Sequence, residues 1–116
     1  MILCAVDDLL FSIKISTAAK GLGADVYFER SADMVLPRIR EKKPSLVIFD
    51  LNSNRLAPIQ RIAEMKSDPE LKDVRTLGYV SHVDSATIAA ARAAGIDEVL
   101  ARSAFSARLA EILTTA

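Results

Sequence analysis

Short runs of consecutive apolar residues alternate along the chain with longer stretches in which apolar residues recur every three or four positions. Runs that are apolar at successive positions are typical of strands covered on both faces, as in parallel sheets. Five such runs predict strands at residues 1–6, 24–28, 45–49, 75–80 and 98–101. A helix-length segment follows each of them, so strand and helix alternate from one end of the chain to the other.

The intervening segments carry the spacing and the end signals of helices. Positions 11, 15, 18 and 22 of the first segment are apolar and share one helical face, and Gly23 is placed to end that helix in a left-handed turn. Helix starts are expected at residues that cap or open helices. These are Ser31, Pro58, Asp84 and, for the last helix, Ser103 or Ser106.

Strict alternation of strands and helices predicts an α/β fold, a doubly wound five-stranded parallel sheet with helices on both faces. Ligands of such sheets bind at the carboxyl ends of the strands. Asp7 and Asp8 follow the first predicted strand and Asp50 follows the third. Three carboxylates that close repel one another unless a cation joins them, and Mg²⁺ suits such oxygen ligands. The alternative interpretation is that an aspartate after a strand only caps the next helix.

Length and composition narrow the classes of protein. The 116 residues predict a single domain over residues 1–116, and an apolar fraction of 51% is enough for a core. Fifteen basic residues balance fifteen acidic ones, which argues against nucleic acid or an anionic membrane as a partner. The single cysteine, Cys4, excludes an internal disulfide and a cysteine-based zinc site. The apolar run at residues 1–6 is too short for a signal peptide or a membrane span, so we expect a cytoplasmic protein.

Three stretches resemble a known family when they are taken in order. They are Val6-Asp7-Asp8, the run Pro44-Ser-Leu-Val-Ile-Phe-Asp50-Leu51, and Ala93-Ala-Gly-Ile-Asp-Glu-Val99. Together they resemble the receiver domain of bacterial response regulators, over essentially the whole chain. The resemblance implies the flavodoxin-like strand order 2-1-3-4-5.

The resemblance also implies a site and its partners. Asp50 would be the phosphoacceptor, and Asp7 and Asp8 would hold Mg²⁺ together with Asp50 and the backbone carbonyl of Asn52. The phosphoryl group would come from a histidine kinase or a phosphotransfer protein. Such a domain is a signalling module of a two-component system and is not an enzyme in the ordinary sense.

Several positions depart from the receiver pattern. Val80 stands in place of the Thr or Ser of the fourth strand, and Ser81 reaches the pocket only if that strand has already ended. Arg102 stands in place of the Lys after the fifth strand, and Val99 replaces an aromatic residue. Since valine can neither donate a hydrogen bond nor swing as an aromatic ring does, we expect an impaired conformational switch.

These features leave two main hypotheses. The first is a stand-alone receiver in which Asp50 accepts a phosphoryl group in the presence of Mg²⁺ and the switch is impaired. The alternative is a phosphorylation-independent pseudo-receiver that acts as a docking or dimerisation module. In either, the output surface is expected on the fourth helix, fifth strand and fifth helix, toward a downstream protein or a second copy. A small flavodoxin-like ligand binder has no flavin or cobalamin motif in its favour, and Ser81, His82 and Asp84 are too close in sequence for a catalytic triad.

Overall fold

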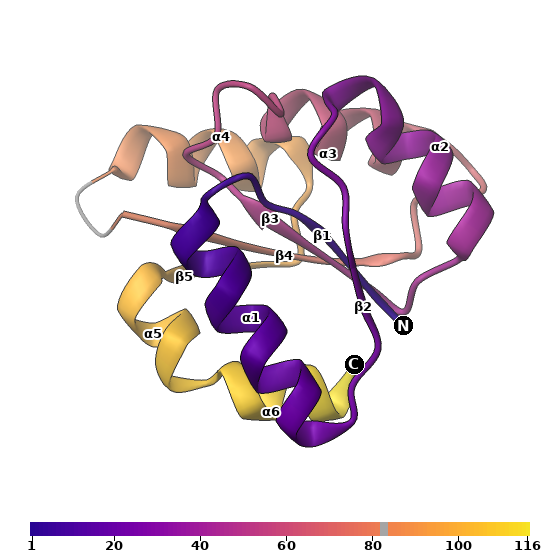
Figure 1. Cartoon of the computed structure of the whole chain (residues 1–116). Helices are drawn as coiled ribbons and strands as arrows, with labels where there is room; N and C mark the ends of the chain where they lie inside the picture. Colours follow the sequence, from indigo (N-terminus) through magenta and orange to yellow (C-terminus); the bar gives the residue numbers. More distant parts are fainter. Residues whose placement is uncertain (82–83) are drawn as a thin grey trace.

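A computed structural model describes residues 1–81 and 84–116, so His82 lies outside the described residues. Five parallel strands form one sheet in the order β2-β1-β3-β4-β5 (Figure 1). The fold class and the strand order are therefore as predicted. The strands are β1 (Ile2–Ala5), β2 (Val26–Phe28), β3 (Leu46–Asp50), β4 (Arg75–Val80) and β5 (Glu98–Ala101).

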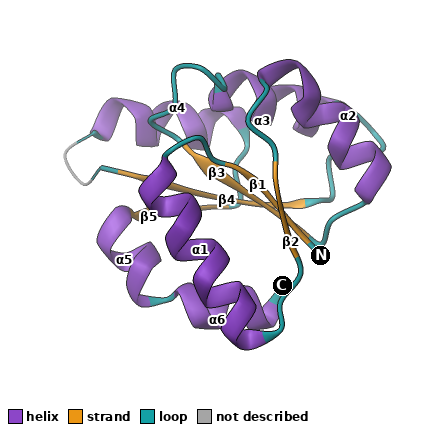
Figure 2. Cartoon of the chain, in the orientation of Figure 1, coloured by secondary structure: helices purple, strands orange, loops and turns teal. Residues whose placement is uncertain are grey.

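Helices cover both faces of the sheet (Figure 2). Helices α1, α5 and α6 lie on one face, and α2, α3 and α4 lie on the other. Gly23 ends α1 in a left-handed conformation with φ of 68°, as its position in the sequence predicts. The helices are α1 (Leu9–Leu22), α2 (Ala32–Lys42), α3 (Pro58–Ser67), α4 (Ser85–Ala94), α5 (Arg102–Ala107) and α6 (Leu109–Thr115).

The last helical segment differs from its prediction. It is divided into α5 and α6 at Arg108, where φ is −100° and ψ is 8°. The prediction that Ser103 or Ser106 caps this segment is wrong, because α5 begins directly after β5 and both serines lie inside it. Arg108 pairs with Glu98 of β5 and with Glu111 of α6, so the break coincides with a side chain that ties the strand to the second helix.

Side chains of each strand alternate between two core layers. Val47, Phe49 and Val80 pack under α2, α3 and α4, whereas Cys4 and Tyr79 pack under α1, α5 and α6. Burial raises the pKa of the Cys4 thiol to about 12, as expected for an unreactive core cysteine. Among residues 1–81 and 84–116, no helix combines the length and the apolar character needed to cross a bilayer.

Candidate functional site

Asp50 ends β3, which lies between β1 and β4 in the sheet. Its Cα is in register with that of Tyr79, so both side chains face the layer of α1 and α5. Asp50 is only 4% exposed, and its Oδ1 accepts a hydrogen bond of 3.1 Å from the backbone N–H of Asn52. A carboxylate in this position is held firmly at the carboxyl edge of the sheet.

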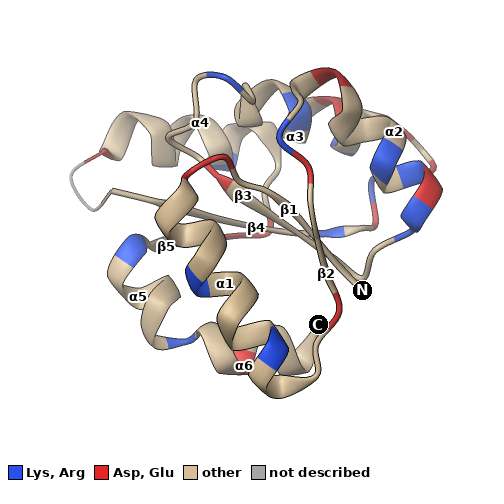
Figure 3. Ribbon diagram, viewed as in Figure 1, with Lys and Arg blue, Asp and Glu red and all other residues tan. Residues whose placement is uncertain are grey.

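Negative charge gathers around Asp50. Burial raises the pKa of Asp50 above its ordinary value, and the nearby carboxylates of Asp7 and Asp8 raise it further. The Asn52 amide and the Arg102 guanidinium act in the opposite direction without cancelling these effects. Figure 3 shows acidic segments at the turn between β1 and α1 and at the end of β3, with a basic segment at the start of α5. Perturbed carboxylates at a strand end are typical of functional sites.

Asp8 has two partners in this structure. Its Oδ1 accepts a hydrogen bond of 3.2 Å from the Phe11 N–H and so caps α1. Its Oδ2 lies 3.4 Å from Nη2 of Arg102. The alternative interpretation, that an aspartate after a strand caps the next helix, therefore holds for Asp8. The same carboxylate also faces the Arg102 guanidinium.

Aromatic rings hold Arg102 beside the acidic edge. Its Cζ lies 4.8 Å from the ring centroid of Phe11 and 5.9 Å from that of Tyr79. The Tyr79 ring in turn stacks on Phe11 and on Phe105, with both centroid distances at 4.8 Å. Guanidinium groups stack well on aromatic faces, so this arrangement restricts the positions open to Arg102. Tyr79 was not predicted as part of the site. The alternation of side chains along β4, which puts Tyr79 on the face of Asp50, is the sequence signal that could have identified it.

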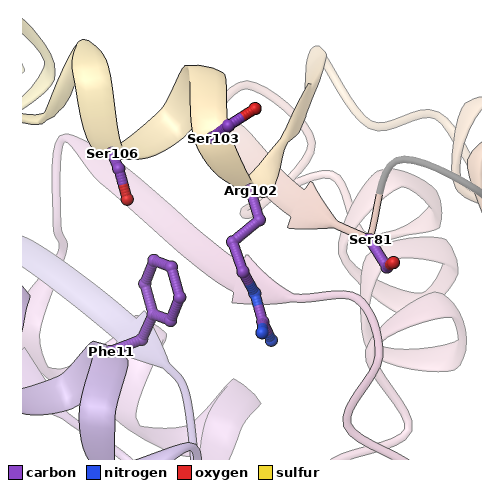
Figure 4. Close-up of a pocket in the computed structure, with 5 residues that line it drawn as sticks. All are labelled: Phe11, Ser81, Arg102, Ser103 and Ser106. Atoms are coloured by element: carbon purple, nitrogen blue, oxygen red, sulfur yellow. The ribbon is translucent and has the colours of Figure 1, made fainter.

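A small cavity opens beside this stack. It has a volume of about 340 Å³ and is lined by Phe11, Ser81, Arg102, Ser103 and Ser106. In Figure 4, the Arg102 side chain extends from the start of α5 between Phe11 and Ser81. Arg102 and Ser81, which the sequence analysis assigned to the site, thus line one cavity.

The Tyr79 hydroxyl is a buried polar group that finds no hydrogen-bond partner in the described part of the chain. Burial of such a group costs about 1–3 kcal/mol of stability. We expect Tyr79→Phe, which keeps the ring stack, to raise the free energy of unfolding by about 1 kcal/mol in urea denaturation. The matched control is Tyr27→Phe on the half-buried β2, which should change little. A clear loss of stability in Tyr79→Phe would mean that the hydroxyl has a partner, such as a water.

Ser81 directly follows β4, so the condition for its reaching the pocket is met. Its N–H donates a hydrogen bond of 2.9 Å to Oδ1 of Asn52. Nδ2 of Asn52 donates at 2.9 Å to Oδ2 of Asp84, the residue that caps α4. Hydrogen bonds from Thr87 and then from Asn52 lower the pKa of Asp84 below its ordinary value. From the sequence only the Asn52 carbonyl was expected at the site, and this side-chain bridge was not predicted.

The two valines that depart from the receiver pattern lie away from the cavity. Val80 is fully buried in the layer of α2, α3 and α4, and Val99 is partly buried in the same layer. Neither faces the aromatic stack that carries Arg102. Asp7, Asp8, Asp50, Ser81 and Arg102 gather at the carboxyl edge, whereas these two valines belong to the core behind it.

The chain matches no family model and no curated protein. It is similar to solved structures. A response regulator from Hahella chejuensis superposes with a TM-score of 0.85 at 15% identity, over 97% of this chain and 91% of that one. The Mn²⁺-bound form of response regulator Rcp1 gives 0.81 at 17% identity, over 99% and 95%. The phosphorylated cyanobacterial phytochrome response regulator RcpA gives 0.77 at 21% identity, over 98% and 88%.

The chain has the receiver-domain fold of response regulators. At these identities the likeness concerns the backbone, so the role of each site residue rests on its own surroundings. In this fold the acids that follow β1 and end β3 lie at the edge of the sheet where ligands are expected.

The residues at this edge fit a divalent cation by donor chemistry. Asp7, Asp8 and Asp50 offer hard carboxylate oxygens, and the pKa of Asp50 is raised by burial first and by Asp7 and Asp8 second. Within the described residues, however, no three acidic, His or Cys side chains are gathered as a ready ligand set. Asp8 faces Arg102 instead, so a cation at this edge would compete with this guanidinium for one carboxylate.

Proposed function

We propose that the chain is a receiver-type signalling domain that accepts a phosphoryl group on Asp50. The observation that carries this proposal is the buried carboxylate at the end of the central strand, with Arg102 beside it and the Ser81 amide at the next strand end. Two similar structures, one named as phosphorylated and one as Mn²⁺-bound, support the assignment by analogy.

The chemistry asks mainly for position and charge. One Asp50 oxygen is held by the Asn52 amide, and the other attacks the phosphorus of a phosphohistidine on a kinase or phosphotransfer protein. A P–O bond forms and the P–N bond breaks, and the electron pair leaves with the imidazole nitrogen, which takes a proton from solvent. Arg102 and the Ser81 N–H stabilise the charge on the transferred group.

Asp7, Asp8, Asp50 and the Asn52 carbonyl are the proposed holders of Mg²⁺. When bound, the ion neutralises charge on the phosphoryl oxygens. Asp8 would share its carboxylate between Arg102 and the ion, which would leave the guanidinium available to the phosphoryl group. Its aromatic stacking keeps Arg102 near the edge during this exchange.

The conformational response is proposed to be limited. A ligand shifts a two-state equilibrium only through contacts that differ between the states. Val80 is buried and has no donor, and Val99 is a stiff side chain packed in the same layer. Changes are therefore expected in the loops that follow β3 and β4, without strong changes across α4 and β5.

Partner surfaces follow from exposed apolar side chains. Leu9, Leu10 and Ile13 of α1 are 68%, 79% and 54% exposed, close to the acidic edge. This patch suits the apolar helical face of a phosphoryl donor. Contact with a downstream protein or a second copy through α4, β5 and α5 stays a prediction.

A phosphorylation-independent interaction module is the second candidate. The observation that favours it is that the two hydrogen-bond donors proposed to bind the phosphoryl group already have partners within the chain. Arg102 pairs with Asp8, and the Ser81 N–H is bound by Asn52. In this alternative the carboxyl edge is a closed polar network and only the surface carries the signal.

Incubation with Mg²⁺ and acetyl phosphate, a small acyl phosphate, distinguishes the two candidates. Intact mass spectrometry is expected to show the addition of one phosphoryl group, removable by hydroxylamine as an acyl phosphate is. The control Asp25→Asn, at an exposed position, should gain one phosphoryl group as the native chain does, whereas Asp50→Asn should gain none. Absence of the adduct from the native chain, also with a phosphohistidine donor, would leave the interaction module as the function.

A further inference from the structure

The Asn52 side chain joins three elements of the site. Its Oδ1 accepts from the Ser81 N–H after β4, and its Nδ2 donates to Asp84 at the start of α4, both at 2.9 Å. Its own N–H donates to Asp50 Oδ1. Both ends of one short carboxamide are therefore engaged, and they tie the loop after β3 to Asp84, the N-cap of α4.

The bridge occupies a donor that a phosphoryl group on Asp50 needs. A backbone N–H makes one strong hydrogen bond, and the Ser81 N–H donates it to Oδ1 of Asn52. A phosphoryl oxygen is charged, and hydrogen bonds to charged acceptors are roughly twice as strong as neutral ones. The carboxamide is thus the weaker of two acceptors for the same N–H, and Asn52 is exposed, so water can replace its lost partners.

We propose that the Asn52 side chain is a latch that competes with the phosphoryl group for the Ser81 amide, so that phosphorylation of Asp50 releases α4 from the β3 end. This inference rests on the proposed function and names the element that reports on the state of Asp50. The release is local, because Asp84 keeps its hydrogen bonds from Thr87 N at 3.0 Å and Thr87 Oγ1 at 2.7 Å. Helix α4 stays capped and loses only its tether.

The latch gives this receiver fold a route to α4 that does not use Val80 or Val99. The signal passes from Asp50 to Ser81, then through the freed Asn52 to Asp84 and the first turn of α4. The phosphoryl group replaces Asn52 at the Ser81 N–H, and the exposed Asn52 side chain, having lost this anchor, exchanges Asp84 for water, so no aromatic rotation is needed. The reporting surface is therefore the start of α4, within the region expected to contact partners.

Binding of beryllofluoride, a phosphoryl mimic, with Mg²⁺ tests the latch without a kinase. Asn52→Ala removes the competing acceptor, so its apparent affinity is expected to be about threefold to tenfold higher than that of the native chain, the scale of one net hydrogen bond. Asn54→Ala, at an exposed asparagine of the same loop, is the matched control and should leave the affinity unchanged. Titration followed by fluorine NMR gives both values.

Amide hydrogen exchange supplies an independent readout. In the native chain, beryllofluoride should increase exchange at Thr87 and Ile88, whose N–H groups bond to Asp84 at the start of α4, and protect the Ser81 N–H. In Asn52→Ala the first turn should exchange fast without ligand and change little on binding. Asp84→Ser, which keeps a capping oxygen but shortens the reach to Asn52, should give the same α4 result.

The outcomes separate the latch from the proposed function. If the native chain binds beryllofluoride and Asn52→Ala binds it equally or more weakly, the latch is wrong and the phosphoacceptor stands. If neither protein binds beryllofluoride, the proposed phosphoacceptor function is wrong, and the latch, which rests on it, is wrong as well. Binding by Asn52→Ala alone would support the latch in its strongest form, as a contact that closes the site.

Discussion

Asp50→Asn is expected to raise the free energy of unfolding at neutral pH by about 0.5–2 kcal/mol. The same substitution should abolish phosphoryl acceptance, because functional sites often keep residues that lower stability. Burial, then Asp7 and Asp8, raise the pKa of Asp50 in the folded chain. Asparagine removes the charge that these effects penalise. It also keeps an oxygen that can accept from the Asn52 N–H, so the local hydrogen bond survives.

The dependence of this gain on pH has a definite sign. Because the folded-state pKa of Asp50 is raised, the folded chain binds more protons than the unfolded chain between the two pKa values, and its stability falls as pH rises through that window. The gain from Asp50→Asn should therefore grow from near zero at a pH of about 3 and level off above the folded-state pKa of Asp50.

Urea denaturation of both proteins from about pH 3 to pH 7 measures this difference directly, over the range where aspartate titrates. Asp25→Asn, at an exposed position, is the control and should show no such trend. A loss of stability in Asp50→Asn at neutral pH would show that Arg102 and the Asn52 amide outweigh burial and the two neighbouring acids.

The fold could be predicted because its strands are covered on both faces. Strands of this kind consist of continuous apolar runs, which can be recognised in the sequence. The runs at 75–80 and 98–101 coincide with β4 and β5. The helix ends were equally local, since Gly23 and Asp84 act on their own neighbours. The strand order is a long-range property, and it came only with the resemblance to receivers.

The contacts of the site could not be predicted, because they join residues far apart in the chain. Asp8 and Arg102 are 94 positions apart, and Asn52 and Ser81 are 29 apart. Whether Ser81 faces the cavity depends on where β4 ends, and no local pattern fixes that boundary to one residue. The break at Arg108 was missed for a related reason: its partners Glu98 and Glu111 lie on two different elements.

Gly78→Ala is expected to lower the free energy of unfolding by about 2–3 kcal/mol, the cost of overpacking a tight core. Gly78 lies in the sheet beside Phe49 of β3 and Val99 of β5. A Cβ added there would lie 2.7 Å from Cγ and Cδ1 of Leu51 and 2.9 Å from Cδ1 of Ile96. Because Leu51 is buried, its Cγ can clear the added methyl only if the side chain rotates about χ1 inside the packed core or the Leu51 backbone shifts.

Either adjustment lies next to the site, because Leu51 directly follows Asp50 and its N–H donates to the Tyr79 carbonyl at 3.0 Å. Gly78→Ala should therefore also weaken beryllofluoride binding, and Gly78→Ala combined with Leu51→Ala should recover part of that binding. Gly21→Ala is the matched control: no atom lies within 4 Å of its added Cβ, and in α1 it should stabilise by about 0.5–1 kcal/mol. Equal effects of the two glycine substitutions in urea denaturation would contradict the close approach of Leu51 to β4.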